Sequence, residues 1–151
     1  FKGLLRIGFR NIHIFIHHQS ENFVQGMPTD LAFKFAARQS IFEFIEANLG
    51  EGWWGKESSK DYYTQQEKGQ DPFNWIKIHP FITEEIQKKF PIDHAGKQET
   101  SLMLTFCPDG VDMKKFDESK WYSKTAKEAS LEYIKEAREE ILSDIKKILK
   151  N

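Results

Sequence analysis

The sequence predicts an α/β fold, because some segments have the two-residue period of strands and others the longer period of helices. Residues 11–16, Asn-Ile-His-Ile-Phe-Ile, form a short apolar run that is typical of a buried strand. Residues 75–79 alternate as a second short strand that ends before a proline. Residues 31–49 and 125–150 instead repeat apolar side chains at steps of three and four, which indicates two amphipathic helices. Strands and helices in alternation are typical of the α/β class.

The first fifty residues give one strand between two helices. The first ten residues resemble the end of a helix, with Gly8 as its stop before the strand. A loop runs through Gly26, and Thr29 or Asp30 is suited to cap the next helix, which Gly50 ends. The apolar positions of that helix cover a wide face, so we expect it to be heavily buried. They are Leu31, Phe33, Phe35, Ile41, Phe42, Phe44, Ile45 and Leu49.

The rest of the chain is predicted to be mainly helical. Residues 51–74 have the composition of a long, partly ordered loop, and loops of this length often act as lids or binding elements. A short helix is expected over residues 83–90, capped by its first residue, and a longer one over residues 95–106. Residues 107–110, Cys-Pro-Asp-Gly, break the second of these helices. The last helix is expected to run unbroken over residues 125–150.

Length, charge and cysteine content limit the class of protein. With 151 residues and 39% hydrophobic side chains, the chain is long enough for one globular domain, and we expect a single domain over residues 1–151. The 22 basic and 23 acidic residues leave a formal charge of −1, which argues against nucleic acid or an anionic membrane as the main partner. Cys107 is the only cysteine, so a reducing compartment and a cytoplasmic location are the simplest expectation. No apolar run approaches the roughly 20 residues of a membrane span.

Possible metal ligands gather where the first strand ends, in the element His17-His18-Gln19-Ser20-Glu21-Asn22. In open α/β sheets the ends of the strands are where chemistry usually takes place. The carboxylate of Glu21, beside imidazoles, is suited to bind a divalent cation or to move a proton, and equally to cap a loop. His17 and His18 point to opposite sides if both belong to the strand, so one of them is expected to be structural.

A second set of proton carriers precedes the helix expected over residues 95–106. His94 lies just before the helix, whose free N–H groups favour an anion or a developing oxyanion, and it is a candidate acid or base. Asp93 is expected to cap the helix. Glu99 is suited either to chemistry or to holding backbone N–H groups or Ser101. Together, the two clusters indicate a metal-dependent hydrolase.

Two tryptophans, Trp53 and Trp54, lie between Gly52 and Gly55 in the expected loop. Aromatic residues in loops often pack the loop down or fill a subunit interface. The flanking glycines favour another interpretation, a flap that closes over a small ring-shaped substrate and excludes water.

Residues 94–104, His-Ala-Gly-Lys-Gln-Glu-Thr-Ser-Leu-Met-Leu, resemble the HAGxxETSLML signature of the creatininase (creatinine amidohydrolase) family. Residues 8–12, Gly-Phe-Arg-Asn-Ile, also resemble that family's lead into a strand that ends in His-x-Glu-Asn or His-Gly-Gly-Asn, here Glu21-Asn22. The resemblance covers almost the whole chain. It implies a three-layer α/β fold with a mainly parallel sheet flanked by helices, and two divalent ions, zinc or manganese, at the strand ends. It also implies ring-opening hydrolysis of a small cyclic amide by a homo-oligomer, commonly a hexamer.

By position, the resemblance implies a role for several side chains. Glu21 would be a metal ligand that also serves catalysis, and His94 would transfer the proton. Trp53 or Trp54 would be the counterpart of the family's aromatic gate, and Asn22 would hold the strand-end loop in shape. We therefore expect the two tryptophans, Asn22 and Glu99 to surround the substrate.

The chain departs from the family pattern at two places. Where the family has a metal-binding histidine, the chain has Gln19, unless the loop shifts by one residue and offers His18. Both stay candidate metal ligands, and a glutamine oxygen would suit Mn²⁺ or Mg²⁺ better than Zn²⁺. The family's Glu-x-His and bridging Asp belong to an N-terminal part of the domain that we expect to be absent from this chain.

The substrate stays open between two chemical classes. It is a cyclic amide in the name-giving enzyme, whereas the Trp-Trp loop also resembles a branch that acts on a cyclic keto-polyol such as a dehydro-inosose. An alternative of a different kind is a non-catalytic fragment or degenerate subunit, in which the acids and histidines serve packing and subunit contacts.

Overall fold

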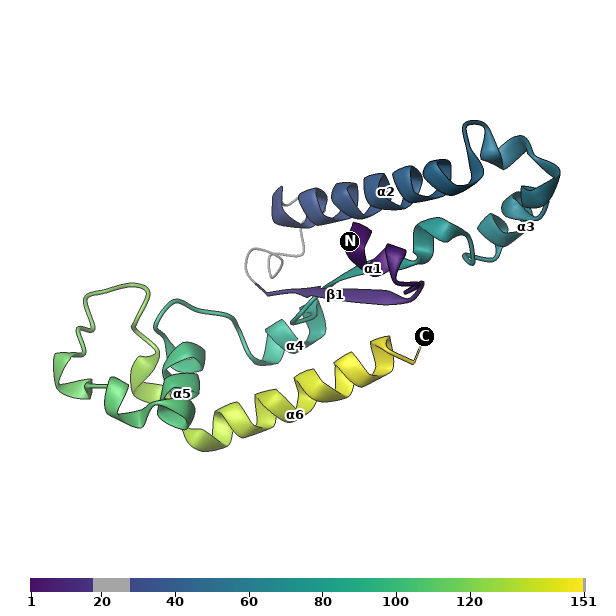
Figure 1. Ribbon diagram of the computed structural model, residues 1–151. Coiled ribbons are helices and arrows are strands. Elements are labelled where there is room, and N and C mark those ends of the chain that lie inside the picture. Colours follow the sequence, from purple (N-terminus) through teal and green to yellow (C-terminus); the bar gives the residue numbers. More distant parts are fainter. Residues whose placement is uncertain (18–27, 151) are drawn as a thin grey trace. The chain divides into compact units, whose positions relative to one another are not determined.

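The structure, a computed structural model, describes residues 1–17 and 28–150 (Figure 1). The chain forms two compact units, Phe1–Pro80 and Phe81–Asn151, and each has its own cluster of buried apolar side chains. A single domain made of both units stays a prediction. Within the described residues, no helix has the length and apolar character required to cross a bilayer.

The first unit is built on a two-stranded parallel sheet. Strand β1 (Ile12–Ile16) pairs with β2 (Ile76–Pro80), with Ile12 opposite Ile76 and Ile16 opposite Pro80. Parallel strands need a long crossover connection, and helix α2 (Pro28–Leu49) belongs to it. Both strands lie within one residue of their predicted positions, and the α/β class is confirmed at this coarse level.

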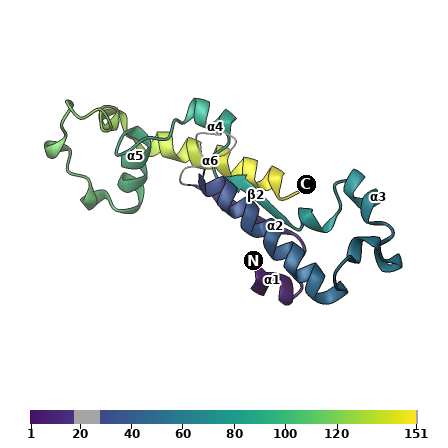
Figure 2. The same cartoon turned by 90° about the horizontal axis from the view of Figure 1, so that it is seen from above.

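Alternation along the strands gives the sheet one apolar face and one face that carries histidines. On the apolar face, Ile12 and Ile76 pack with helix α1 (Lys2–Arg6) and with α2, which runs along the sheet (Figures 1 and 2). The buried members of this core are Leu5, Ile12, Ala37, Ile41, Ile45, Trp53 and Ile76.

Arg10 fixes the short connection between α1 and β1. Its guanidinium lies 4.5 Å from the ring centroids of both Phe44 and Trp75, and it donates a hydrogen bond of 2.9 Å to the carbonyl of Leu5. Gly8 has a φ of 106°, which ends α1 as predicted, since a side chain is rarely tolerated there. The Gly-Phe-Arg-Asn element thus has a structural role.

Helix α2 departs from the prediction in its start and in its burial. It begins at Pro28, a residue that favours the first helical position, so Thr29 and Asp30 lie in the first turn instead of capping it. Leu31 and Phe35 are 51% and 71% exposed, so the expected heavy burial is wrong for the N-terminal half. The physical reason is that apolar residues surround the helix on several sides, and a two-stranded sheet is too narrow to cover them all.

The segment expected to be a long loop is a series of short helices instead. They are η1 (Trp53–Gly55), η2 (Glu57–Ser59), α3 (Tyr62–Glu67) and η3 (Pro72–Asn74). Buried Asp71 caps the last of them, because its carboxylate accepts a hydrogen bond of 2.9 Å from the N–H of Phe73. Aromatic packing and this cap order a segment whose composition suggested a loop.

In the second unit, the regular elements that the structure describes are all helices. Its longer elements are α4 (Glu84–Lys89), α5 (Lys97–Phe106) and α6 (Leu131–Ile148). Three single turns, η4 (Pro108–Gly110), η5 (Met113–Lys115) and η6 (Ala126–Glu128), connect α5 to α6. Its core consists of Ile82, Ile86, Phe90, Ile134 and Ala137.

Helix α6 starts later than the sequence predicts. Ser130 caps it by accepting a hydrogen bond of 3.1 Å from the N–H of Tyr133, so the unbroken helix expected from residue 125 is wrong over its first six residues. Helix α4, in contrast, begins directly after Thr83, as predicted, although the Thr83 side chain makes no capping hydrogen bond.

We expect Ile41→Ala to lower the free energy of unfolding by roughly 2 to 5 kcal/mol, because Ile41 is fully buried in the first core. Leu31→Ala is a matched control on the same helix, and it should cost less than about 1 kcal/mol because that side chain is half exposed. Urea unfolding measures both values. Equal losses in the two variants would contradict the described burial of α2.

Candidate functional site

The turn that precedes α5 is held by a carboxylate cap. The Asp93 side chain accepts hydrogen bonds of 2.8 and 3.1 Å from the N–H groups of Gln98 and Glu99. These N–H groups belong to the first helical turn and have no partner within the helix. The predicted capping role of Asp93 is confirmed.

The two small residues of the turn are required by its geometry. Ala95 has a φ of 55°, in the left-handed region that residues with side chains rarely adopt. Its N–H donates a hydrogen bond of 2.7 Å to Glu99 Oε2, which fixes this conformation. At Gly96, a Cβ atom would lie 2.6 Å from both Asp93 Oδ2 and Thr125 Oγ1, too close for any side chain.

Two further residues of the motif fasten α5 to its surroundings. Ser101, fully buried, donates to the carbonyl of Lys97 and accepts a hydrogen bond of 3.0 Å from the N–H of Ser130. The side-chain amide of Gln98, also buried, is oriented so that its nitrogen donates to the carbonyls of residues 90–91, at 3.1 and 3.0 Å. The turn is thereby tied to the segments on both sides of it.

His94 differs from its neighbours in this motif. Its imidazole is exposed, and it makes no hydrogen bond or ion pair with any residue of the ranges 1–17 and 28–150. Imidazole is the side chain most often used as a general acid or base. The turn therefore presents a proton carrier on a rigid base, with its ring nitrogens accessible.

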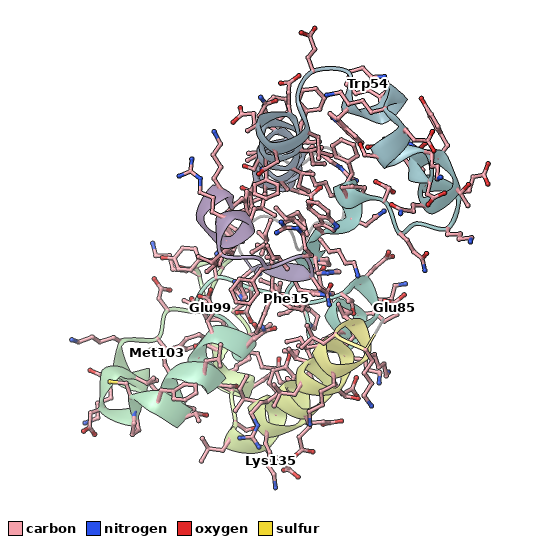
Figure 3. All side chains as sticks on the ribbon, turned by 45° about the vertical axis from the view of Figure 1, so that its right-hand side comes forward. Phe15, Trp54, Glu85, Glu99, Met103 and Lys135 are labelled. Atoms are coloured by element: carbon pink, nitrogen blue, oxygen red, sulfur yellow. The ribbon has the colours of Figure 1, made fainter. Side chains whose placement is uncertain are left out.

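A cavity of about 560 Å³ lies within the second unit, beside this turn. Glu99 and Met103, one helical turn apart on α5, belong to its wall (Figure 3). A concave surface with a few polar groups is typical of small-molecule sites. Its hydroxyl and charged side chains are Glu99, Thr100, Asp112, Lys115, Asp117, Lys120, Tyr122 and Ser123. Glu99 thus has a structural bond to the turn and also faces a cavity, and its contact with substrate stays a prediction.

The two tryptophans have different environments. Trp53 is 3% exposed, and its ring lies edge-on to that of Tyr62, with 4.9 Å between the centroids. This is the packing interpretation that we considered for the pair. Trp54 is 41% exposed and stands on the surface of η1 (Figure 3). Of the two residues, only Trp54 has the exposure that a substrate gate needs.

The predicted metal ligands His18, Gln19 and Glu21, and the neighbouring Asn22, lie outside the described residues, so their roles stay predictions. In the part of the chain that the structure describes, no three His, Cys, Asp or Glu side chains lie close enough to hold a metal ion.

A pair of histidines that the sequence reasoning missed lies on the second face of the sheet. His13 Nδ1 and His79 Nε2 are 3.0 Å apart, and the ring planes differ by 10°. His13 Nε2 lies 3.0 Å from Asn11 Oδ1. The only signal in the sequence was a histidine on each of two alternating strands. The sequence could not show the register of these strands, in which Phe15 lies opposite His79.

The surroundings of this pair favour neutral imidazoles. Burial lowers the pKa of His13, and the charge of Lys77 lowers it further. Burial also lowers the pKa of His79, with smaller contributions from His13 and Lys77. Because Asn11 Oδ1 can only accept, His13 carries its proton on Nε2, and His79 Nε2–H donates to His13 Nδ1.

No protein-family model, no curated protein and no solved structure matches this chain.

We expect the metal-free protein to lose stability below about pH 6.5 through His13 and His79. Since the pKa of each imidazole is lower than its ordinary value of 6.5, the unfolded state binds more protons as the pH falls through this range. Their contribution to stability is therefore fully present above the ordinary pKa and is lost as the pH falls through the lowered values. Thermal unfolding at a series of pH values measures it.

Two variants test the assignment of this pH dependence. Lys77→Gln removes the charge and keeps both imidazoles, so it should reduce the slope of stability against pH without abolishing it. A His13→Gln/His79→Gln double variant should remove that part of the slope. A double variant with the slope of the wild type would show that other groups cause it.

Gly96→Ala should destabilise the protein by roughly 1 to 3 kcal/mol, because its Cβ displaces the Asp93 carboxylate from the helix start. Gly55→Ala is the matched control, since a Cβ there meets no atom within 4 Å. Differential scanning calorimetry of both variants measures the effect. An unchanged melting temperature in Gly96→Ala would contradict the described turn.

Proposed function

We propose that the protein is a metal-dependent hydrolase of the creatininase type, which opens a small cyclic substrate such as a cyclic amide. One observation carries the proposal. Asp93, Ala95, Gly96, Glu99 and Ser101 all serve to build one turn, while the imidazole of His94 within the same motif is left exposed. A motif that holds one free proton carrier in place has the arrangement that acid–base catalysis needs.

In this proposal, His94 delivers a proton to the leaving nitrogen of a cyclic amide, or to the enolate that is released when a carbon–carbon bond of a cyclic keto-polyol breaks. At the start of α5, the N–H groups of Gln98 and Glu99 donate to Asp93 and that of Lys97 donates to Thr125, so the expectation that free N–H groups there favour a developing oxyanion is wrong. Glu21, with His18 or Gln19, would help to hold two zinc or manganese ions in the complete enzyme. When bound, such ions supply Lewis acidity and an activated water.

The proposal includes the three-layer fold and a homo-oligomer, which by family resemblance is a hexamer. A parallel sheet is normally covered on both faces, and sheets usually have more than two strands. The two-stranded sheet and the exposed apolar residues of α2, Leu31 and Phe35, are consistent with further layers around them.

A second candidate substrate, a cyclic keto-polyol, is favoured by the cavity beside the turn. Its wall carries the hydroxyl groups of Thr100, Tyr122 and Ser123 together with the carboxylate of Glu99. Such groups both donate to and accept from the hydroxyl groups of a polyol.

The decisive experiment is hydrolysis of creatinine, other small cyclic amides and a cyclic keto-polyol by the purified protein, with Mn²⁺ or Zn²⁺ present. His94→Ala should lower kcat by about 10²-fold to 10⁴-fold, with little change in melting temperature, because the side chain makes no structural bond. Lys124→Ala, an exposed side chain nearby in the second unit, is the control and should retain activity.

Turnover that survives in His94→Ala would remove this residue from the mechanism. Metal analysis adds an independent measurement, for which about two equivalents per chain are expected. A folded protein with no bound metal and no turnover of any of these substrates would favour a non-catalytic subunit instead.

A further inference from the structure

The distance between the two histidines of the sheet is that of neighbouring ligands on one metal ion. Imidazole nitrogens bind divalent transition metals at about 2.0 to 2.1 Å, so two of them at a right angle lie about 2.8 to 3.0 Å apart. In a tetrahedral site the same nitrogens would lie about 3.3 to 3.4 Å apart. The 3.0 Å between His13 Nδ1 and His79 Nε2 lies within a few tenths of an ångström of both values, so the two nitrogens are placed to bind one ion.

A second observation concerns the nitrogen of His13 that faces away from the pair. His13 Nε2 donates to Asn11 Oδ1 over 3.0 Å, which leaves the lone pair on Nδ1, the atom that faces His79. Histidines that bind metals nearly always donate their other N–H to an oxygen in this way, which fixes the tautomer and the direction of the ring. Asn11 thus prepares His13 as a ligand.

The ring of His79 also contacts a second aromatic ring. The ring of Phe15, the residue opposite His79 on β1, stacks on it with 5.3 Å between the centroids. The lowered pKa of both imidazoles keeps them neutral at physiological pH, which is the form that binds metals. Both side chains are only partly buried.

We propose that His13 Nδ1 and His79 Nε2 together bind one divalent ion of the copper(II) class, with water in the remaining positions. Without the ion, His79 Nε2–H donates to His13 Nδ1. With the ion, that proton moves to His79 Nδ1, so a neutral pair releases no net proton on binding. Because the Irving–Williams order places Cu²⁺ above Ni²⁺ and Zn²⁺, Cu²⁺ should bind most tightly.

Titration of the purified protein with Cu²⁺, against a competing chelator at slightly alkaline pH, tests this site. Electron paramagnetic resonance should show a tetragonal Cu²⁺ with nitrogen ligands. His79→Gln should remove one equivalent of bound Cu²⁺ per chain and its nitrogen signal. His94→Gln, which removes an imidazole of the second unit, is the matched control and should keep that equivalent. The difference in bound Cu²⁺ between these two variants distinguishes this site from any other metal site on the chain.

Asn11→Leu tests the orientation of the ligand and keeps both imidazoles. Its side chain is exposed, so the fold should be retained, and we expect Cu²⁺ affinity to fall about 10-fold with unchanged stoichiometry. If circular dichroism shows that His79→Gln does not fold, the Cu²⁺ affinity of Asn11→Leu decides the test. Full Cu²⁺ binding in a folded His79→Gln, or an Asn11→Leu affinity equal to that of the wild type, would overturn the proposal.

Discussion

The parallel pairing of β1 (Ile12–Ile16) with β2 (Ile76–Pro80) is the constraint on which the first unit depends. In a strand, a shift of register by one residue turns every side chain to the opposite face. Such a shift in β2 would place Lys77 and His79 against α2 and expose Ile76 and Ile78. The apolar core on one face and the histidine pair on the other therefore follow from a single register, and neither can change without the other.

The second unit depends on a different kind of constraint, a network of hydrogen bonds from side chains to the backbone. Asp93 and Glu99 satisfy N–H groups around the start of α5, and Ser101 connects α5 to the residue that caps α6. Buried polar groups stabilise a fold when their bonds are satisfied and destabilise it when they are not. The turn that carries His94 is consequently as specific as a packed core, although much of it lies at the surface.

Local signals in the sequence predicted the strands and the longer helices, and several of the misses arose where a distant residue decides. The alternating isoleucines gave both strands, and Gly8 gave the end of α1. The start of α6 was missed because Ser130 is held by Ser101, which lies 29 positions earlier in the chain. In the candidate site, the cap by Asp93 was predictable from its position. The bond from Ala95 to Glu99 depends on a left-handed φ that composition does not reveal, and the approach of His13 to His79 depends on register.

The left-handed conformation of Ala95 limits how this position can vary over evolution. Glycine would adopt the same φ without strain, and asparagine or aspartate would do so at a small cost. Valine, isoleucine and threonine would clash with their own backbone there. Substitutions at this position should therefore be confined to small and short polar residues. A branched side chain would be tolerated only if the connection before α5 changed as well.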